Sequence, residues 1–143
     1  MALSATHDKI NLVATGIAMG IAVYYRYPSD VVLMLGVATV FGGVYFSPDI
    51  DTFSVPYKRW GYFRWWWKGY QKWLGHRGYG HLPILGTVSR LMWTIPFWLP
   101  LVYYFRPPKN YLIVLLLGLE ISSLVHWFTD IMSFRKADNV KRR

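Results

Sequence analysis

The 143-residue sequence contains no cysteine. Disulfide bonds, thiolate metal sites and a cysteine nucleophile are therefore excluded. Charged residues are also scarce, at 16% of the chain against about 25% in an average soluble domain. Because 54% of the residues are hydrophobic, the composition is typical of a chain for which water is not the only solvent.

Acidic residues are the scarcer of the charged types. Seven aspartates and glutamates face sixteen lysines and arginines, which gives a formal net charge of +9. A positive charge of this size suits an anionic membrane surface or a nucleic acid.

Long apolar runs are what the sequence does contain. Four of them cover about residues 10–27, 31–47, 82–105 and 110–128. A helix needs about 20 residues to cross a bilayer core, and about 17 are tolerated. We predict an all-α, polytopic membrane protein with about four transmembrane helices in one domain, residues 1–143. The alternative is a soluble bundle of buried helices, but 143 residues supply little protein to cover helices that are apolar on every face.

The order of the spans predicts a topology. If each run crosses the membrane once, the N-terminus, the loop 48–81 and the tail 133–143 lie on one side. Twelve lysines and arginines belong to this side and three to the other. The positive-inside rule makes the richer side cytoplasmic. We therefore expect an integral protein of a plasma or thylakoid membrane, with both termini cytoplasmic.

Histidines and aspartates gather on this same side. Imidazole and carboxylate groups are ligands of zinc, manganese and iron. His126 and Asp130 are four residues apart, hence on one face of a helix. Asp49 and Asp51 follow a proline, where an extended backbone would point both side chains the same way. The candidate metal ligands are His7, Asp49, Asp51, His76, His81, His126 and Asp130.

Seven candidates exceed the three or four ligands of one zinc site and would suit two ions. We expect zinc or manganese as the divalent ion. Each residue alone also has an ordinary structural interpretation, such as a helix cap for His7 or a turn residue for Asp49. Their convergence on one side of the membrane favours a metal site.

Three further charged residues lie near this set. Arg90 and Glu120 fall inside the third and fourth spans, about 9–14 Å below their cytoplasmic ends, where we expect them to form an ion pair. Glu120 as a general base, or as a further ligand, is the alternative. Arg77, beside His76, is expected to hold a phosphate or stabilise a developing anion.

The segment YKRWGYFRWWWKGYQKW, residues 57–73, contains nine aromatic and five basic residues. Tryptophan and tyrosine favour the headgroup region, and cations there attract anionic lipid. We predict a helical segment that lies along the interface and contacts anionic lipid. Stacking on nucleic-acid bases is a second interpretation, which we do not expect because exposed tryptophans would be poorly soluble. A third is a groove for a lipid-like or phosphorylated substrate.

The motifs THD, SPDID, YKRWG, HRGYGH and HWFTD occur in this order along the chain. Together they resemble a group of uncharacterised metal-binding membrane proteins common in cyanobacteria. That group is similar to the membrane-bound metal-dependent hydrolases, also known as LexA-binding, inner-membrane-associated hydrolases. The resemblance covers about residues 4–134. It implies a helical membrane protein with a divalent metal site and hydrolase activity, and it carries the ligand role onto the seven residues above.

Three functions remain open from the sequence. The first is a metal-dependent hydrolase at the cytoplasmic membrane face, acting on a phosphoester or another lipid-associated ester, with Arg77 and Glu120 as candidate catalytic residues. The second is a non-catalytic metal-binding subunit or assembly factor, whose partners are other membrane-protein subunits. The third, a pigment or quinone held between spans, is supported by His126 and the aromatic residues.

Overall fold

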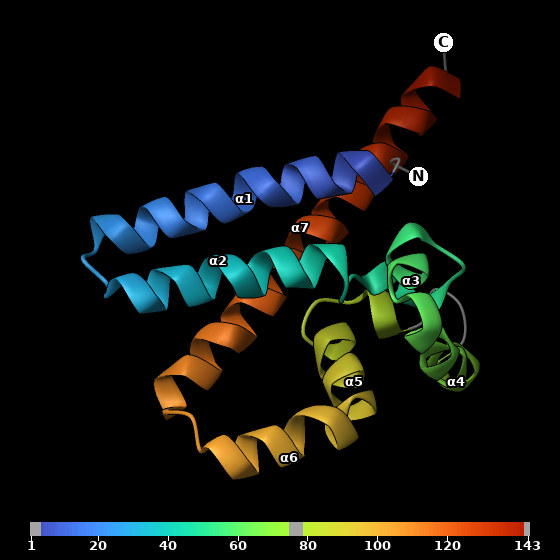
Figure 1. Ribbon diagram of the computed structural model, residues 1–143. Helices are drawn as coiled ribbons and strands as arrows, with labels where there is room; N and C mark the ends of the chain where they lie inside the picture. Colours follow the sequence, from blue (N-terminus) through green and yellow to red (C-terminus); the bar gives the residue numbers. More distant parts are fainter. Residues whose placement is uncertain (1–3, 75–78, 142–143) are drawn as a thin grey trace.

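The computed structural model describes residues 4–74 and 79–141, and its elements are helices (Figure 1). The longer ones are α1 (Ser4–Tyr24), α2 (Ser29–Val44), α3 (Val55–Arg59), α4 (Arg64–Leu74), α5 (Leu85–Trp93), α6 (Ile95–Phe105) and α7 (Lys109–Lys141). Three short 3₁₀ helices are η1 (Pro48–Asp51), η2 (Gly61–Phe63) and η3 (Tyr79–His81). The two described ranges contain no β-strand, so the predicted all-α class is confirmed.

Helices α1, α2 and α7 form the largest unit. α1 and α2 run antiparallel as a hairpin, and α7 crosses them (Figure 1). Small residues allow α2 and α7 to approach closely, as is common where helices pack in a membrane. A Cβ atom added to Gly118 would lie 2.5 Å from the Cβ of Ala38, and one added to Gly42 would lie 2.8 Å from that of Ser122.

Both chain ends and the α3–α4 region lie at one end of this unit (Figure 1). The loops that follow α1 and α6 lie at the opposite end. The topology count from the sequence expects these segments to lie together, whereas their place relative to a membrane stays a prediction. The candidate ligands of α1, η1, η3 and α7 can therefore meet.

Residues 82–105, predicted as one span, form two helices. α5 ends at Trp93 and α6 begins at Ile95, with Thr94 between them. Pro96 has no backbone N–H to donate, so it favours a new helix start over continuation. The last helix runs beyond residue 128 to Lys141. Ser29–Asp51 and Lys109–Ser133 are each long and apolar enough to cross a membrane, and the four-span arrangement stays a prediction.

The aromatic-basic segment forms α3, η2 and α4, as the sequence predicted for a helical segment. Its aromatic residues divide between the interior and the surface. Trp67 and Tyr70 are buried in a cluster with Ile50 of η1, whereas Trp65 is 62% exposed. Because Ile50 lies between Asp49 and Asp51 in sequence and is fully buried, this cluster anchors the turn that carries both aspartates.

Candidate metal centre

Helix α7 contributes the two residues at the middle of the site. His126 and Asp130 lie one turn apart, and His126 Nε2 is 3.4 Å from Asp130 Oδ2. The His126 ring is buried. Its other nitrogen, Nδ1, lies 3.4 Å from the Oγ atom of Ser47, which directly precedes η1. Both ring nitrogens therefore face polar groups of known position.

His7 reaches the same place from the beginning of α1. Its ring stacks on that of His126, with centroids 4.2 Å apart and planes inclined by 20°. Its Nε2 atom is 3.4 Å from Asp130 Oδ1, so the two oxygens of this carboxylate face two different imidazoles. The site thus joins the first and last helices of the fold.

The aspartates of η1 face two different histidines. Asp49 Oδ1 lies 3.4 Å from His126 Nε2, whereas the two oxygens of Asp51 lie 3.2 and 3.3 Å from Nε2 of His81. The expectation that an extended backbone would point both aspartates the same way is wrong. Residues 48–51 form a 3₁₀ helix, in which residues two apart are rotated by about 240°.

Two sets of three side chains could hold a metal ion. One consists of His7, His126 and Asp130, and the other of Asp49, His81 and His126. Within each set the potential ligand atoms lie within 4.8 Å of one another. Because both sets contain His126, this residue is the common element of either site.

The distances fit a metal centre better than a hydrogen-bonded cluster. Hydrogen bonds between N and O measure about 2.7–3.2 Å. Two ligands bound at about 2.0–2.1 Å in a tetrahedron are about 3.4 Å apart. His126 Nε2 lies 3.4 Å from both Asp49 and Asp130, which is an ion-pair distance for a protonated ring and is longer than an ordinary hydrogen bond. Among the described residues this buried nitrogen therefore has no hydrogen-bond partner, as expected for an atom aimed at an ion.

Arg90 positions the segment that carries His81. It is fully buried, and its guanidinium donates to the carbonyl of Gly80 at 3.2 Å and to Ser123 Oγ at 2.7 Å. Gly80 directly precedes His81, so these bonds tie η3 to α5 and α7. The expected Arg90–Glu120 ion pair is absent from the described part of the chain: Glu120 instead accepts a hydrogen bond from the backbone N–H of Ile84 at 2.7 Å. Its carboxylate thereby holds the start of α5.

Two contacts of the site were not predicted from the sequence. Besides Ser47, the pair Asp8–Arg59 holds the start of α1 against α3, with both carboxylate oxygens engaged at 2.5 and 3.2 Å. Arg59 also donates to the carbonyl of Val44 at the end of α2. Its hydrogen bonds to Asp8 raise the pKa of Arg59 above the ordinary value, so the guanidinium stays charged. The sequence feature that pointed to this role of Asp8 is its position next to His7.

The remaining candidates are placed as follows. His76 and Arg77 lie outside the described residues. In the described ranges, Glu120 of α7 belongs to neither set of metal ligands, and its carboxylate instead accepts the hydrogen bond from Ile84, just before α5. His7, Asp49, Asp51, His81, His126 and Asp130 come together at one end of the molecule.

Comparison with known proteins identifies a family. The family described as "Uncharacterized metal-binding protein (DUF2227)" matches residues 2–110. An "Uncharacterized protein" of Aquifex aeolicus (strain VF5) is 34% identical over 67 residues, which are 46% of this chain and 48% of the relative. The match thus spans about half the length of that relative. No solved structure matches the chain.

Proposed function

The chain belongs to the family of uncharacterized metal-binding proteins, and from this premise we propose that it holds a divalent ion at the described site. The proposed ligands are His7, Asp49, His81, His126 and Asp130. The observation that carries the proposal is the position of His126 Nε2, which is buried, has no hydrogen-bond partner among the described residues and lies 3.4 Å from two carboxylates. The nitrogen and oxygen ligands suit zinc or manganese.

Metal analysis of the purified protein tests this proposal. We expect wild-type protein to contain zinc or manganese in a stoichiometric amount and His126→Ala to contain almost none, since His126 belongs to both ligand sets. Trp127→Ala, a change at the next position of α7, is the control and should keep the ion. Wild-type protein that stays free of metal after incubation with zinc or manganese would refute the proposal.

The number of ions follows from two further variants. If each ligand set holds its own ion, His7→Ala and His81→Ala should each lose half of the metal. If one ion is shared, both variants should keep full occupancy at high metal concentration, with weaker affinity.

We further propose that this centre hydrolyses a phosphoester or another lipid-associated ester. A bound divalent ion would supply Lewis-acid polarisation of the substrate oxygen and activation of water. Around it, the side chains of Asp49, His81 and Asp130 are each about one-fifth exposed, so a substrate group can reach the ligands. His81, held by both oxygens of Asp51, is oriented to bind the ion or to transfer a proton. The resemblance of the sequence motifs to those of the membrane-bound metal-dependent hydrolases favours the same reaction.

Turnover of bis(p-nitrophenyl) phosphate, a chromogenic diester, by metal-loaded protein tests the hydrolase proposal. We expect release of nitrophenolate that depends on the ion and is lost in His126→Ala. The competing function is a non-catalytic subunit of a membrane complex, which is favoured by exposed aromatic side chains such as Tyr62 and Trp73. Metal-loaded protein that is inactive on diesters and esters, yet co-purifies with one defined membrane protein, would favour that alternative.

We also propose that the chain resides in a membrane, with the metal centre on the cytoplasmic side. Helix α6 supports this location because none of its residues is buried: Leu101 and Phe105, for example, are 57% and 70% exposed. Between α1 and α2, by contrast, a polar group is buried, since Asn11 Nδ2 donates to the carbonyl of Thr39. Apolar side chains on the surface together with polar groups between helices are typical of membrane helices.

Single-cysteine labelling can test the membrane arrangement, because the natural chain has no cysteine. Tyr27→Cys and Lys58→Cys place thiols at exposed positions at opposite ends of the fold. In sealed inside-out vesicles a membrane-impermeant maleimide should label position 58 and leave position 27 protected. Equal labelling of both positions would contradict the proposed arrangement.

A further inference from the structure

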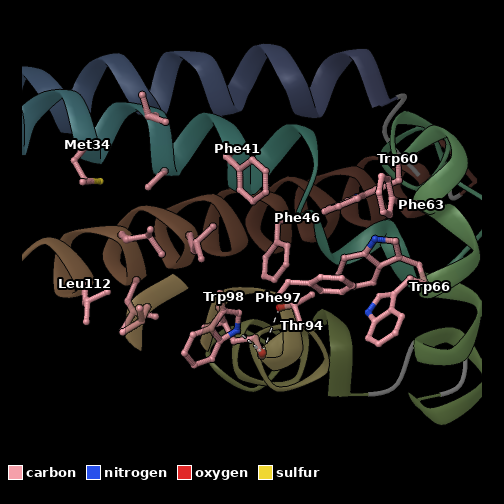
Figure 2. A pocket seen from close by; sticks show the side chains of 18 residues that line it. Met34, Phe41, Phe46, Trp60, Phe63, Trp66, Thr94, Phe97, Trp98 and Leu112 are labelled. Atoms are coloured by element: carbon pink, nitrogen blue, oxygen red, sulfur yellow. Dashed lines mark hydrogen bonds between the residues drawn. The ribbon is translucent and has the colours of Figure 1, made fainter. Parts of the chain in front are cut away.

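A large apolar cavity lies on the side of α2 and α7 that faces α4, α5 and α6. Its volume is about 650 Å³. Figure 2 shows that Met34 and Leu112 lie at one end and Trp60 and Trp66 at the other, with aromatic rings between them. None of the described residues that line the cavity carries a charge. Such a lining suits a hydrocarbon ligand.

The length of the cavity suits one acyl chain. Its wall follows α2 from Met34 and continues through the turn beyond this helix to Phe46, a rise of roughly 15–18 Å. The hydrocarbon layer of one membrane leaflet is about 15 Å thick, half of a core of about 30 Å.

One polar atom at the α4 end lacks a partner. Of the indoles around the cavity, Trp60 donates to the carbonyl of Tyr45 at 2.8 Å and Trp98 to that of Leu91 at 2.9 Å. The Nε1 atom of Trp66 is also buried, but no described residue accepts its hydrogen bond. This atom has almost no accessible surface, so the cavity offers its occupant an apolar wall at this end as well.

Positive charge lies on the same helix. Arg64 and Lys68 are exposed on α4 and line a second, shallower hollow of about 370 Å³ together with Tyr62 and Trp65. Exposed arginine and lysine beside tryptophan and tyrosine are typical of a surface that contacts anionic headgroups.

From these features we infer that the cavity binds one acyl chain of an anionic membrane phospholipid. The acyl chain fills the apolar cavity, and the headgroup stays outside it, where the exposed Arg64 and Lys68 attract its negative charge. A phospholipid supplies the hydrocarbon and the negative charge in one molecule. This site is separate from the metal centre and does not depend on the proposed reaction.

Lipid binding by variants that fill the cavity tests the inference. Val102 of α6 lines the cavity, whereas its neighbour Leu101 is 57% exposed and does not. We expect Val102→Trp to weaken the binding of phosphatidylglycerol to the purified full chain by about tenfold or more, because the indole occupies space that the chain needs. Leu101→Trp is the matched control and should bind as the wild type does. Native mass spectrometry of detergent-solubilised protein, titrated with phosphatidylglycerol, measures both.

A double variant tests the attraction of the headgroup without filling the cavity. Arg64→Gln combined with Lys68→Gln should abolish the preference of the wild type for phosphatidylglycerol over phosphatidylcholine.

Three results would overturn the inference. The first is equal lipid binding by Val102→Trp and Leu101→Trp, with both variants helical by circular dichroism and loaded with metal. The second is a wild type that does not prefer the anionic lipid. In the third, Val102→Trp dissociates a dimer of the wild type and leaves lipid binding unchanged, which would show that a second copy of the chain covers the cavity.

Discussion

The orientation of His126 depends on the hydroxyl of Ser47. A ligating imidazole is usually fixed by a hydrogen bond at its second nitrogen, and loss of that bond typically weakens metal binding about 10- to 100-fold. Ser47 Oγ lies 3.4 Å from His126 Nδ1, which is longer than an ordinary hydrogen bond. The hydroxyl is therefore expected to be a weak partner that helps to set which nitrogen faces the carboxylates.

Substitution of this serine should weaken metal binding without removing a ligand. For Ser47→Ala we expect about a tenfold loss in affinity for zinc or manganese, at the lower end of that range. The control is Ser133→Ala, because the hydroxyl of Ser133 donates only to the carbonyl of Thr129 in the same helix. Competition with a chromogenic chelator measures both affinities. Equal affinity for Ser47→Ala and the wild type would show that the ring is held by its other contacts.

Arg90 is predicted to stabilise the fold and to position the segment that carries His81. Arg90→Met would leave the carbonyl of Gly80 without its charged donor, and we expect a loss of about 3 kcal/mol in unfolding free energy together with weaker metal binding. Thermal unfolding in detergent and metal analysis measure the two effects. Arg64→Met, at an exposed position of α4, should change neither. Normal stability and metal content for Arg90→Met would contradict the positioning role.

The residue types of the site could be predicted from sequence, but their pairing could not. Imidazoles and carboxylates at the predicted cytoplasmic ends of the helices indicated a cluster. The partners of Asp49 and Asp51 depend on the 3₁₀ turn of residues 48–51, which the motif SPDID did not reveal. Arg90 lies within hydrogen-bond distance of Gly80 and Ser123 because η3 folds back onto α5, a tertiary contact without a sequence signal.

At the scale of elements, the site depends on the close approach of α2 and α7. His126 and Asp130 belong to α7, whereas Asp49 follows α2, so any separation of these helices lengthens the contacts between them. Gly118 and Ala38 lie where the approach is tight.

A methyl group at Gly118 should force the two helices apart. We expect Gly118→Ala to destabilise the protein by about 1–3 kcal/mol, because the added carbon would lie 2.5 Å from the Cβ of Ala38 and 3.0 Å from the backbone nitrogen of Thr39. Gly20→Ala in α1, where no atom lies within 4 Å of the added carbon, should be neutral or up to about 1 kcal/mol stabilising. The midpoints of thermal unfolding of both variants check this. A stable Gly118→Ala variant would indicate a looser helix contact.

The apolar runs of the sequence predicted where helices occur better than they predicted where each helix begins and ends. The run 82–105 is apolar apart from Arg90 and a few small polar residues, so it was predicted as one span, yet Thr94 separates α5 from α6. Pro96 and Pro100 were visible in the sequence, but a proline is tolerated within a membrane helix as well as at a helix start. Only the packing of α5 beside α7 and η3 distinguishes the two outcomes.

At the scale of the whole molecule, a bound ion is expected to stabilise the fold. The ligands come from α1, η1, η3 and α7, and an ion that binds only the folded chain adds stability by mass action. At a free concentration about 100 times the dissociation constant, this stabilisation is about 2.7 kcal/mol.

Chelation should therefore lower the unfolding temperature. We expect EDTA to destabilise metal-loaded wild-type protein by about 2–3 kcal/mol and to leave His126→Ala unaffected. Acidification should release the ion as well, since protons compete for the imidazole nitrogens. Calorimetry with and without chelator measures the first effect, and metal analysis after gel filtration at decreasing pH measures the second. Identical unfolding with and without EDTA would mean that the ion does not couple to the fold.

The stacking of His7 on His126 joins residues separated by nearly the whole chain. During synthesis His7 cannot form this contact until α7 has been made. Ion capture by the His7–His126–Asp130 set would then require α7, and fragments that end before this helix would lack the stability that the bound ion adds. Metal uptake by a growing chain would thus report that α1 and α7 have come together.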